Sequence, residues 1–163
     1  MSEITTMMLL LLGPVFAVSL AGQQESDVAG EIIAMERAML ERWCNGDPWG
    51  FIEISAPEIS YHDPALQRRI DGFEAFRDYL APIEGTIYAD SFELLNPRVQ
   101  VHGDVAVLSF NFVSYSASEG TTRESRWNST EVYSRIDGEW KLIHSHWSHT
   151  QPFAQQEELE EAP

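Results

Sequence analysis

Residues 124–147 read ESRWNSTEVYSRIDGEWKLIHSHW, and this stretch decides the fold. Asp137-Gly138 separates two runs of sequence. In each run the side chains alternate with the period of two that is typical of a β-strand. An Asp-Gly pair suits a type I′ turn, because both central residues of that turn take a positive φ. The stretch is therefore predicted to form a β-hairpin, with strands over about residues 124–136 and 139–147.

The same period of two continues toward the N-terminus. It predicts two further strands, over about residues 92–101 and 105–115, joined by the turn His102-Gly103-Asp104. Each strand then follows its neighbour through a short connection, as in an antiparallel meander. We therefore expect four antiparallel strands in the C-terminal part of the chain.

Before residue 87 the apolar residues recur mostly at helical spacing. The elements expected there are a helix over 28–44, a helical turn from Asp47, a short strand over 59–63 and a helix over 73–83. Ser26 and Asp27 are expected to cap the first helix and Asp71 the last one. Helices followed by an antiparallel meander predict an α+β domain with the helices packed on one face of a curved sheet.

Composition limits the classes of protein that the chain can represent. Its 163 residues suffice for one domain, and 44% of them are hydrophobic, as in globular proteins. The 26 acidic and 10 basic residues give a formal charge of −16, which repels nucleic acids and anionic membranes. A single cysteine, Cys44, excludes an intrachain disulfide. We expect no nucleic-acid partner and no cofactor.

The two ends of the chain differ from its middle. Met7–Leu20 is an apolar run of signal-peptide length followed by small residues, although no Lys or Arg precedes it. We expect a signal peptide over residues 1–21, export to the periplasm or outside the cell, and no membrane contact of the mature form. Residues 26–152 are expected to form the domain, and the acidic residues 153–163 a disordered tail.

Several short stretches resemble one known group of proteins. LNPRV at 95–99, HGD at 102–104 and DGEWK at 137–141 resemble the association (hub) domain of calcium/calmodulin-dependent protein kinase II. The closing pattern Trp-x-x-x-His-x-His-x-Ser at 140–148 also resembles bacterial SnoaL-like proteins. Both belong to the nuclear transport factor 2-like superfamily. The resemblance implies a cone-shaped α+β fold enclosing a pocket, and self-association into a homodimer or larger assembly.

That superfamily includes isomerases, dehydratases, cyclases and assembly modules, so the fold alone does not assign a function. The chain has none of the kinase signatures, which excludes kinase activity. The first interpretation is a self-associating domain that binds a small apolar or aromatic molecule. By alignment, the pocket arginines of the kinase hub fall here on Val113, Glu131 and Trp147, which would not favour anionic ligands.

The second interpretation is a cofactor-independent isomerase, cyclase or dehydratase. Asp63 ends the first strand, and Tyr61 lies two residues earlier on the same face. In enzymes of the superfamily a carboxylate in an apolar pocket acts as general base, and a phenol can stabilise the developing oxyanion. Asp63 could instead cap the turn at Pro64.

The C-terminal strands are rich in aromatic residues. We expect a ligand-binding group made of Trp49, Trp127, Glu131, Tyr133 and Trp147. The alternative for the aromatic residues is a place in the core or in a subunit interface. The alternative for Glu131 is an ion pair at the mouth of the cone with Arg98, Arg126 or Arg135.

His144 and His146 share one face of the last strand, because side chains two residues apart point to the same side. They could bind a metal ion with a third ligand from His149, His62 or Asp63. The same His-x-His occurs in relatives without a metal, so hydrogen bonds within the sheet or at a subunit contact are favoured. No metal site is predicted.

Overall fold

A computed structural model describes residues 15–118 and 120–150, with side chains described from residue 22 onward. The elements before the meander are α1 (Val15–Cys44), α2 (Trp49–Ile54), β1 (Ser55–His62), β2 (Ile70–Asp71), α3 (Phe73–Leu80) and a 3-10 turn (Ala81–Ile83). The meander consists of β3 (Ser91–His102), β4 (Val105–Ser118), β5 (Thr121–Ile136) and β6 (Glu139–His149). All four predicted meander strands are present.

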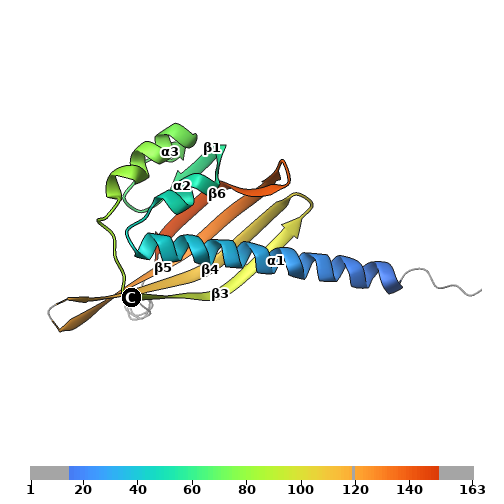
Figure 1. Ribbon diagram of the computed structural model, residues 1–163, viewed down its shortest axis with the longest axis horizontal. Coiled ribbons are helices and arrows are strands. Elements are labelled where there is room, and N and C mark those ends of the chain that lie inside the picture. Colours follow the sequence, from blue (N-terminus) through green and yellow to red (C-terminus); the bar gives the residue numbers. More distant parts are fainter. Residues whose placement is uncertain (1–14, 119, 151–163) are drawn as a thin grey trace, which may run out of the picture.

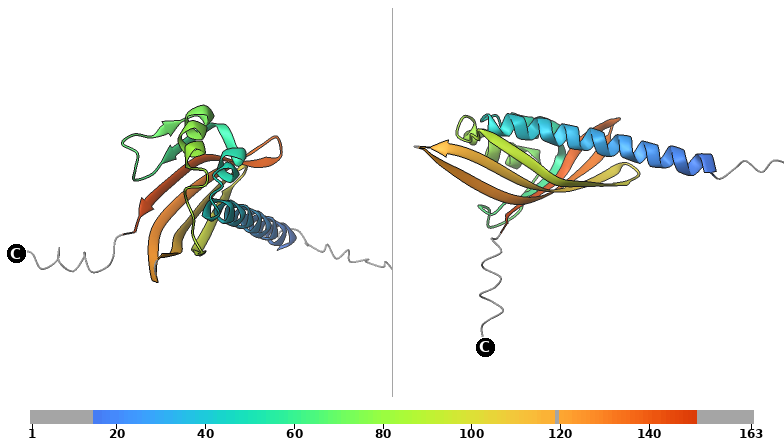
Figure 2. Two further views of the ribbon diagram at one scale, coloured as in Figure 1. Left: turned by 60° about the vertical axis from the view of Figure 1, so that its left-hand side comes forward. Right: turned by 90° about the horizontal axis from the view of Figure 1, so that it is seen from below.

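These strands form one six-stranded sheet in the order β2-β1-β6-β5-β4-β3. Every neighbouring pair is antiparallel except β1 and β6, which run parallel. The helices lie over one face of this strongly curved sheet, and α1 crosses it obliquely (Figures 1 and 2). The expected α+β architecture, with N-terminal helices on a mostly antiparallel sheet, is confirmed.

The turn between β5 and β6 has the predicted geometry. Asp137 and Gly138 have φ values of 52° and 86°, as a type I′ turn requires, and Ile136 pairs with Glu139 across it. A bulge lies further along this strand pair, where Tyr133 faces Leu142 and the preceding residue faces His144. The bulge shifts the alternation of β6, so that Leu142 and Ser145 both face the helices.

Two of the predicted helix caps are wrong. Helix α1 starts at Val15, well before Ser26 and Asp27, and the Ser26 hydroxyl donates to the Gln23 carbonyl oxygen (2.8 Å) within the helix. Such a bond to a carbonyl of the preceding turn lets serine remain in a helix interior. Asp71 belongs to β2 and is not the residue that caps α3; that position is held by Gly72, at φ 88°.

The core lies between α1, α3 and the inner face of the sheet. Ile32 and Leu40 on α1 are 0% and 1% exposed, and they pack in one cluster with Leu108 of β4 and Leu142 of β6. Burying each such side chain stabilises the fold by about 1.5–3 kcal/mol. This packing fixes α1 over the sheet and leaves space between α1, α3 and the distal parts of β4–β6.

The two predictions for the chain ends concern residues that are mostly not described. The tail at 153–163 lies outside the described residues, as does the signal peptide apart from the backbone of residues 15–21, which is helical. Both stay predictions. Within residues 15–118 and 120–150, no helix is long and apolar enough to cross a membrane.

Candidate functional site

A cavity of about 560 Å³ lies between the helices and the inner face of the sheet. Its walls are mainly aromatic and aliphatic, and include Leu40, Phe51, Phe76, Phe112, Trp127 and Trp147. Polar groups reach it at a few places, among them Asp63, Tyr79, Ser145 and His149. A largely apolar cavity of this size with a few polar groups is the usual form of a small-molecule site.

Asp63 lies at one end of this cavity, directly after β1. Its Oδ1 accepts a hydrogen bond from the backbone N–H of Ala65 (2.7 Å), and its Oδ2 accepts one from the Tyr79 hydroxyl (2.8 Å). The carboxylate therefore caps its own turn and also faces the cavity. The two roles considered for Asp63 do not exclude one another.

Two phenols lie beside this carboxylate. The rings of Tyr61 and Tyr79 are 5.9 Å apart, and both line the cavity. Burial, reinforced by the hydrogen bond to Asp63, raises the pKa of Tyr79 to about 12. Burial and then the charge of Asp63 raise the pKa of Tyr61 well above its usual value. Both hydroxyls therefore stay protonated at neutral pH and can donate hydrogen bonds.

Trp127 and Trp147, two of the residues expected to bind a ligand, form an aromatic wall of the cavity. The ring of Trp147 meets Phe110, Phe112 and Trp127 edge-on, at centroid distances of 5.6, 5.7 and 6.4 Å. His149, which was not predicted here, stacks on Trp127 at 4.0 Å. Alternation from Trp147 would have placed His149 on the cavity side, since the two residues are two positions apart.

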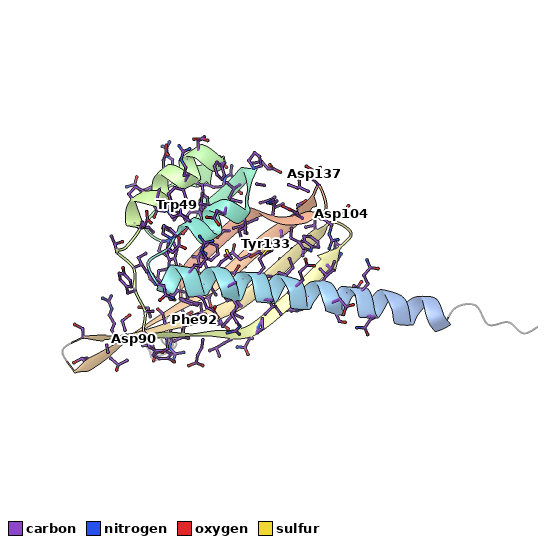
Figure 3. The ribbon with its side chains drawn as sticks, in the orientation of Figure 1. Trp49, Asp90, Phe92, Asp104, Tyr133 and Asp137 are labelled. Atoms are coloured by element: carbon purple, nitrogen blue, oxygen red, sulfur yellow. The ribbon has the colours of Figure 1, made fainter. Side chains whose placement is uncertain are left out.

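Glu131 and Tyr133 are buried beneath the cavity instead of lining it. Both are 0% exposed, and Tyr133 lies on the sheet beside α1 (Figure 3). The Ser129 and Ser145 hydroxyls donate to Oε1 of Glu131 at 2.8 and 3.2 Å. Burial first, and then the nearby Glu36, raise the pKa of Glu131 well above its usual value.

The expected ion pair of Glu131 with an arginine is wrong. Arg126 pairs with Glu124, and Arg135 lies 3.8 Å from Glu31 with its guanidinium over the Trp140 ring. Glu131 is too deeply buried for these half-exposed side chains to reach it, and its hydrogen bonds come from serines.

Glu36 is a buried acid that was not predicted as part of the site. It extends from α1, is 0% exposed, and accepts a short hydrogen bond from the Tyr133 hydroxyl. Burial raises the pKa of Glu36 to about 7, although the Tyr133 hydrogen bond acts in the opposite direction. A sequence signal was present, since Glu36 is four residues from both Ile32 and Leu40 on the apolar stripe of the helix.

Trp49 does not join the other predicted ligand-binding residues. It lies at the start of α2 (Figure 3). It is outside the cavity lining, and its indole N–H donates to Glu84 at 3.1 Å. Val113, which aligns with a pocket arginine of the kinase hub, also lies outside the lining. Phe112 and Ser114 on either side of it face the cavity, so Val113 points to the other face of the sheet.

Three histidines gather on that other, outer face. The ring of His62 lies 6.3 Å from His144 and 5.6 Å from His146, and Nδ1 of His144 is 2.8 Å from the Ser60 hydroxyl oxygen. Burial, followed by the neighbouring histidines and Arg69, lowers the pKa of His144. In the described part of the chain, no three His, Cys, Asp or Glu side chains are arranged to hold a metal ion.

Comparison with solved structures gives similar folds. A candidate ketosteroid isomerase from Parabacteroides distasonis is 38% identical, with a TM-score of 0.65 over 74% of this chain and 86% of that one. The association domain of the Caenorhabditis elegans calcium/calmodulin-dependent kinase II is 21% identical, with a TM-score of 0.67 over 78% and 98%. A candidate dehydratase from Streptomyces avermitilis is 22% identical, with a TM-score of 0.62 over 77% and 99%. The last two, at this identity, show the fold alone.

A sequence family described as the calcium/calmodulin dependent protein kinase II association domain matches residues 28–151. The match begins in α1 and extends past the end of β6, so it contains the whole sheet and the cavity. The chain therefore belongs to the calcium/calmodulin-dependent protein kinase II association domain family and has the nuclear transport factor 2-like fold.

Proposed function

We propose that this protein is a self-associating domain that binds a small apolar or aromatic molecule in its cavity and has no kinase activity. The observation that carries the proposal is the cavity itself, about 560 Å³ in volume, with an aromatic wall that includes Trp127 and Trp147. Flat apolar molecules gain both buried area and ring contacts in such a site. Asp63 and the Tyr79 hydroxyl supply polar partners at one end.

A neutral aromatic probe tests the binding. N-phenyl-1-naphthylamine becomes fluorescent in apolar surroundings, and we expect saturable binding with one site per chain. Ser114 lines the cavity, so Ser114→Phe should fill part of it and weaken binding at least about tenfold. Ser118→Phe, at an exposed position of the same strand, is the matched control. Absence of saturable binding, or equal binding by both variants, would refute the proposed cavity site.

Self-association is proposed through the outer face of the sheet. The described helices cover only the inner face (Figure 2), and the outer face carries half-buried residues such as Val107 and Val132, which pair across β4 and β5. A second copy could cover these valines without exposing new apolar surface. The family to which the chain belongs is that of association domains, which supports the same conclusion.

Light scattering on the purified protein measures the assembly directly. We expect a dimer or larger species, and Val132→Arg should shift it toward the monomer because the charge would be buried in the interface. Thr121→Arg, at an exposed position of β5, should leave the assembly unchanged. A wild-type protein that remains monomeric at micromolar concentration contradicts this part of the proposal.

Proton-transfer catalysis is the second candidate function. It is favoured by one observation, the Asp63 carboxylate that faces an apolar cavity beside two protonated phenols. Asp63 would abstract a proton next to a carbonyl group, and Tyr61 or Tyr79 would donate to the oxyanion that develops. The similarity to a candidate ketosteroid isomerase indicates which substrate class to try first.

A β,γ-unsaturated 3-ketosteroid provides the assay, because its conjugated product absorbs in the ultraviolet. Asp63→Asn should lower kcat by about 10²–10⁴-fold while probe binding is retained. Tyr79→Phe should have a smaller effect, since Tyr61 remains. A turnover rate that Asp63→Asn leaves unchanged excludes Asp63 as the base.

A further inference from the structure

A network of buried polar side chains connects the middle of α1 to the wall of the cavity. It consists of two hydrogen-bonded groups, Glu36 of α1 with Tyr133 of β5, and Glu131 and Ser129 of β5 with Ser145 and Trp147 of β6. The two groups interact through the charges of Glu36 and Glu131. Both carboxyl groups are 0% exposed, and Ser129 and Ser145 are 4% and 3% exposed. Neither of the functions proposed above uses its two acids.

The hydrogen bonds of the second group run in one direction, toward Glu131. The indole N–H of Trp147 donates to the Ser145 hydroxyl oxygen at 3.1 Å, and that hydroxyl donates to Oε1 of Glu131 at 3.2 Å. A serine hydroxyl has a single proton to donate, so the orientation of Ser145 depends on Glu131. The orientation of the Trp147 indole in turn depends on Ser145.

The two buried acids lack any positively charged partner among the described residues. Oε1 of Glu36 and Oε2 of Glu131 have no hydrogen-bond partner there. Among residues 15–118 and 120–150, the other titratable groups that interact with the pair are Tyr133, and Tyr61 on the side of Glu131. Two uncompensated charges buried inside a protein are costly and repel each other, so the pair retains a proton near neutral pH.

Other charged groups on neighbouring elements are directed elsewhere. The Arg135 guanidinium lies over the Trp140 ring, 4.7 Å from its centroid, and near Glu31 at the surface. Tyr133 donates its hydroxyl proton to Glu36 and cannot neutralise it. Burial raises the pKa of Glu36 to about 7, which places the change in proton number of the pair near physiological pH.

Only one end of the network reaches the cavity. Ser145 and Trp147 line it, whereas Glu36 and Glu131 do not. Trp147 also packs edge-on against Phe110 and Phe112, so a change in its anchoring at Ser145 alters the aromatic wall.

We propose that Glu131, acting through Ser145, positions Trp147 in the cavity wall, and that the charge of the nearby Glu36 modulates this contact. When Glu36 loses its proton to solvent, the negative charge that appears beside Glu131 changes the hydrogen bond between Glu131 and Ser145, and thereby the position of the Trp147 indole. Glu131 is a positioning residue, since it does not touch the cavity. Any effect on ligand affinity rests on the proposed binding function, whereas the coupling between the acids and Trp147 does not.

Nuclear magnetic resonance of the ¹⁵N-labelled full chain tests the coupling without a ligand. The indole N–H signal of Trp147 is identified as the one that Trp147→Phe removes. We expect this signal to shift with pH through a single transition near neutrality. The indole of Trp49, which is bonded to Glu84 outside the cavity, serves as an internal control and should not follow that transition.

Three variants locate the origin of the shift. Glu36→Gln should remove the transition or move its midpoint, whereas Glu41→Gln, at an exposed position of the same helix, should leave it unchanged. Ser145→Ala should abolish the response of Trp147 even though both acids remain. A Trp147 signal that does not shift between about pH 5.5 and 8.5, or a transition that persists in Glu36→Gln and Ser145→Ala, overturns the proposal.

Binding of N-phenyl-1-naphthylamine then separates this inference from the proposed function. If the coupling affects ligand binding, the affinity of the wild type for the probe changes over the same pH range as the Trp147 signal. The affinity of Ser145→Ala for the probe does not change over this range. Failure of the probe to bind at any pH refutes the binding function, while the indole titration still decides whether the acids position Trp147.

Discussion

Replacing Glu36 by glutamine should remove much of the pH dependence of stability. Burial raises the pKa of Glu36 from 4.5 to about 7, so the folded state binds its proton more tightly than the unfolded state does. Between these two values the folded state carries more protons, and the free energy of unfolding therefore falls as the pH rises. Above about pH 7 the acid is ionised in both states and the loss is complete.

The magnitude follows from the change in pKa. A pKa raised from 4.5 to about 7 corresponds to about 3 kcal/mol, at about 1.4 kcal/mol per pH unit. Glutamine has nearly the same shape as protonated glutamate and does not ionise. We therefore expect Glu36→Gln to match the wild type within about 1 kcal/mol at pH 5, and to exceed it by up to about 3 kcal/mol at pH 8.

Urea denaturation, followed by tryptophan fluorescence, measures this effect at about pH 5, 6, 7 and 8, values that span the range in which Glu36 ionises. The protein concentration must be the same in every series, because self-association adds to stability. Glu41→Gln, on the exposed side of α1, controls for the general effect of removing one negative charge. If the free energy of unfolding varies with pH in the same way for the wild type and Glu36→Gln, then the fold does not hold Glu36 neutral.

Three further changes test other parts of the structure. Gly138→Ala should lower the free energy of unfolding by about 1–2 kcal/mol, because Gly138 has a φ of 86°; an unaltered urea midpoint contradicts the type I′ turn. Leu108→Ala should lower it by about 2–5 kcal/mol, because Leu108 is 0% exposed in the core, and a loss below 1 kcal/mol, measured by urea denaturation, would be inconsistent with that burial. Asp63→Asn should lower the pKa of Tyr79 from about 12 part of the way toward its usual value, because the negative charge beside the phenolate is removed. Ultraviolet titration of the phenol measures the last change, and an unchanged curve argues against the Tyr79–Asp63 hydrogen bond.

The meander was predictable because its signals are local. The Asp137-Gly138 turn sets the first pairs of β5 and β6, and alternation along β5 assigns Trp127 to the inner face. Trp147 reaches the inner face because of the bulge at Val132 and Tyr133, since uninterrupted alternation from the turn would have placed it on the outer face. The strand β2 was missed, since the two residues Ile70-Asp71 have no period of their own and pair only because β1 lies beside them. The parallel pairing of β1 with β6 likewise depends on contacts distant in sequence.

The start of α1 was misplaced for a different reason. Ser26 and Asp27 favour a helix cap, but their side chains can also bond within a continuing helix, as Ser26 does with the Gln23 carbonyl. Sequence pattern alone does not distinguish these two uses of the same residues.

The candidate site was predicted only in part. Asp63, Trp127 and Trp147 line the cavity. Strand alternation is sufficient to place Asp63 and Trp127, whereas the position of Trp147 also depends on the bulge between β5 and β6. The contact of Tyr79 with Asp63 comes from the packing of α3 on β1, which no local pattern encodes. Glu36 was missed because glutamate on a helix is normally exposed.

The order of the sheet has a consequence for synthesis. The last strand of the meander, β6, lies in the interior of the sheet between β1 and β5. Its His144 contacts Ser60 of β1, which is 84 residues earlier in the sequence. During translation β1 can have no partner in the meander until β6 has left the ribosome. We expect folding of the sheet to be completed late and slowly, with the edges of β1 and β5 exposed to chaperones until then.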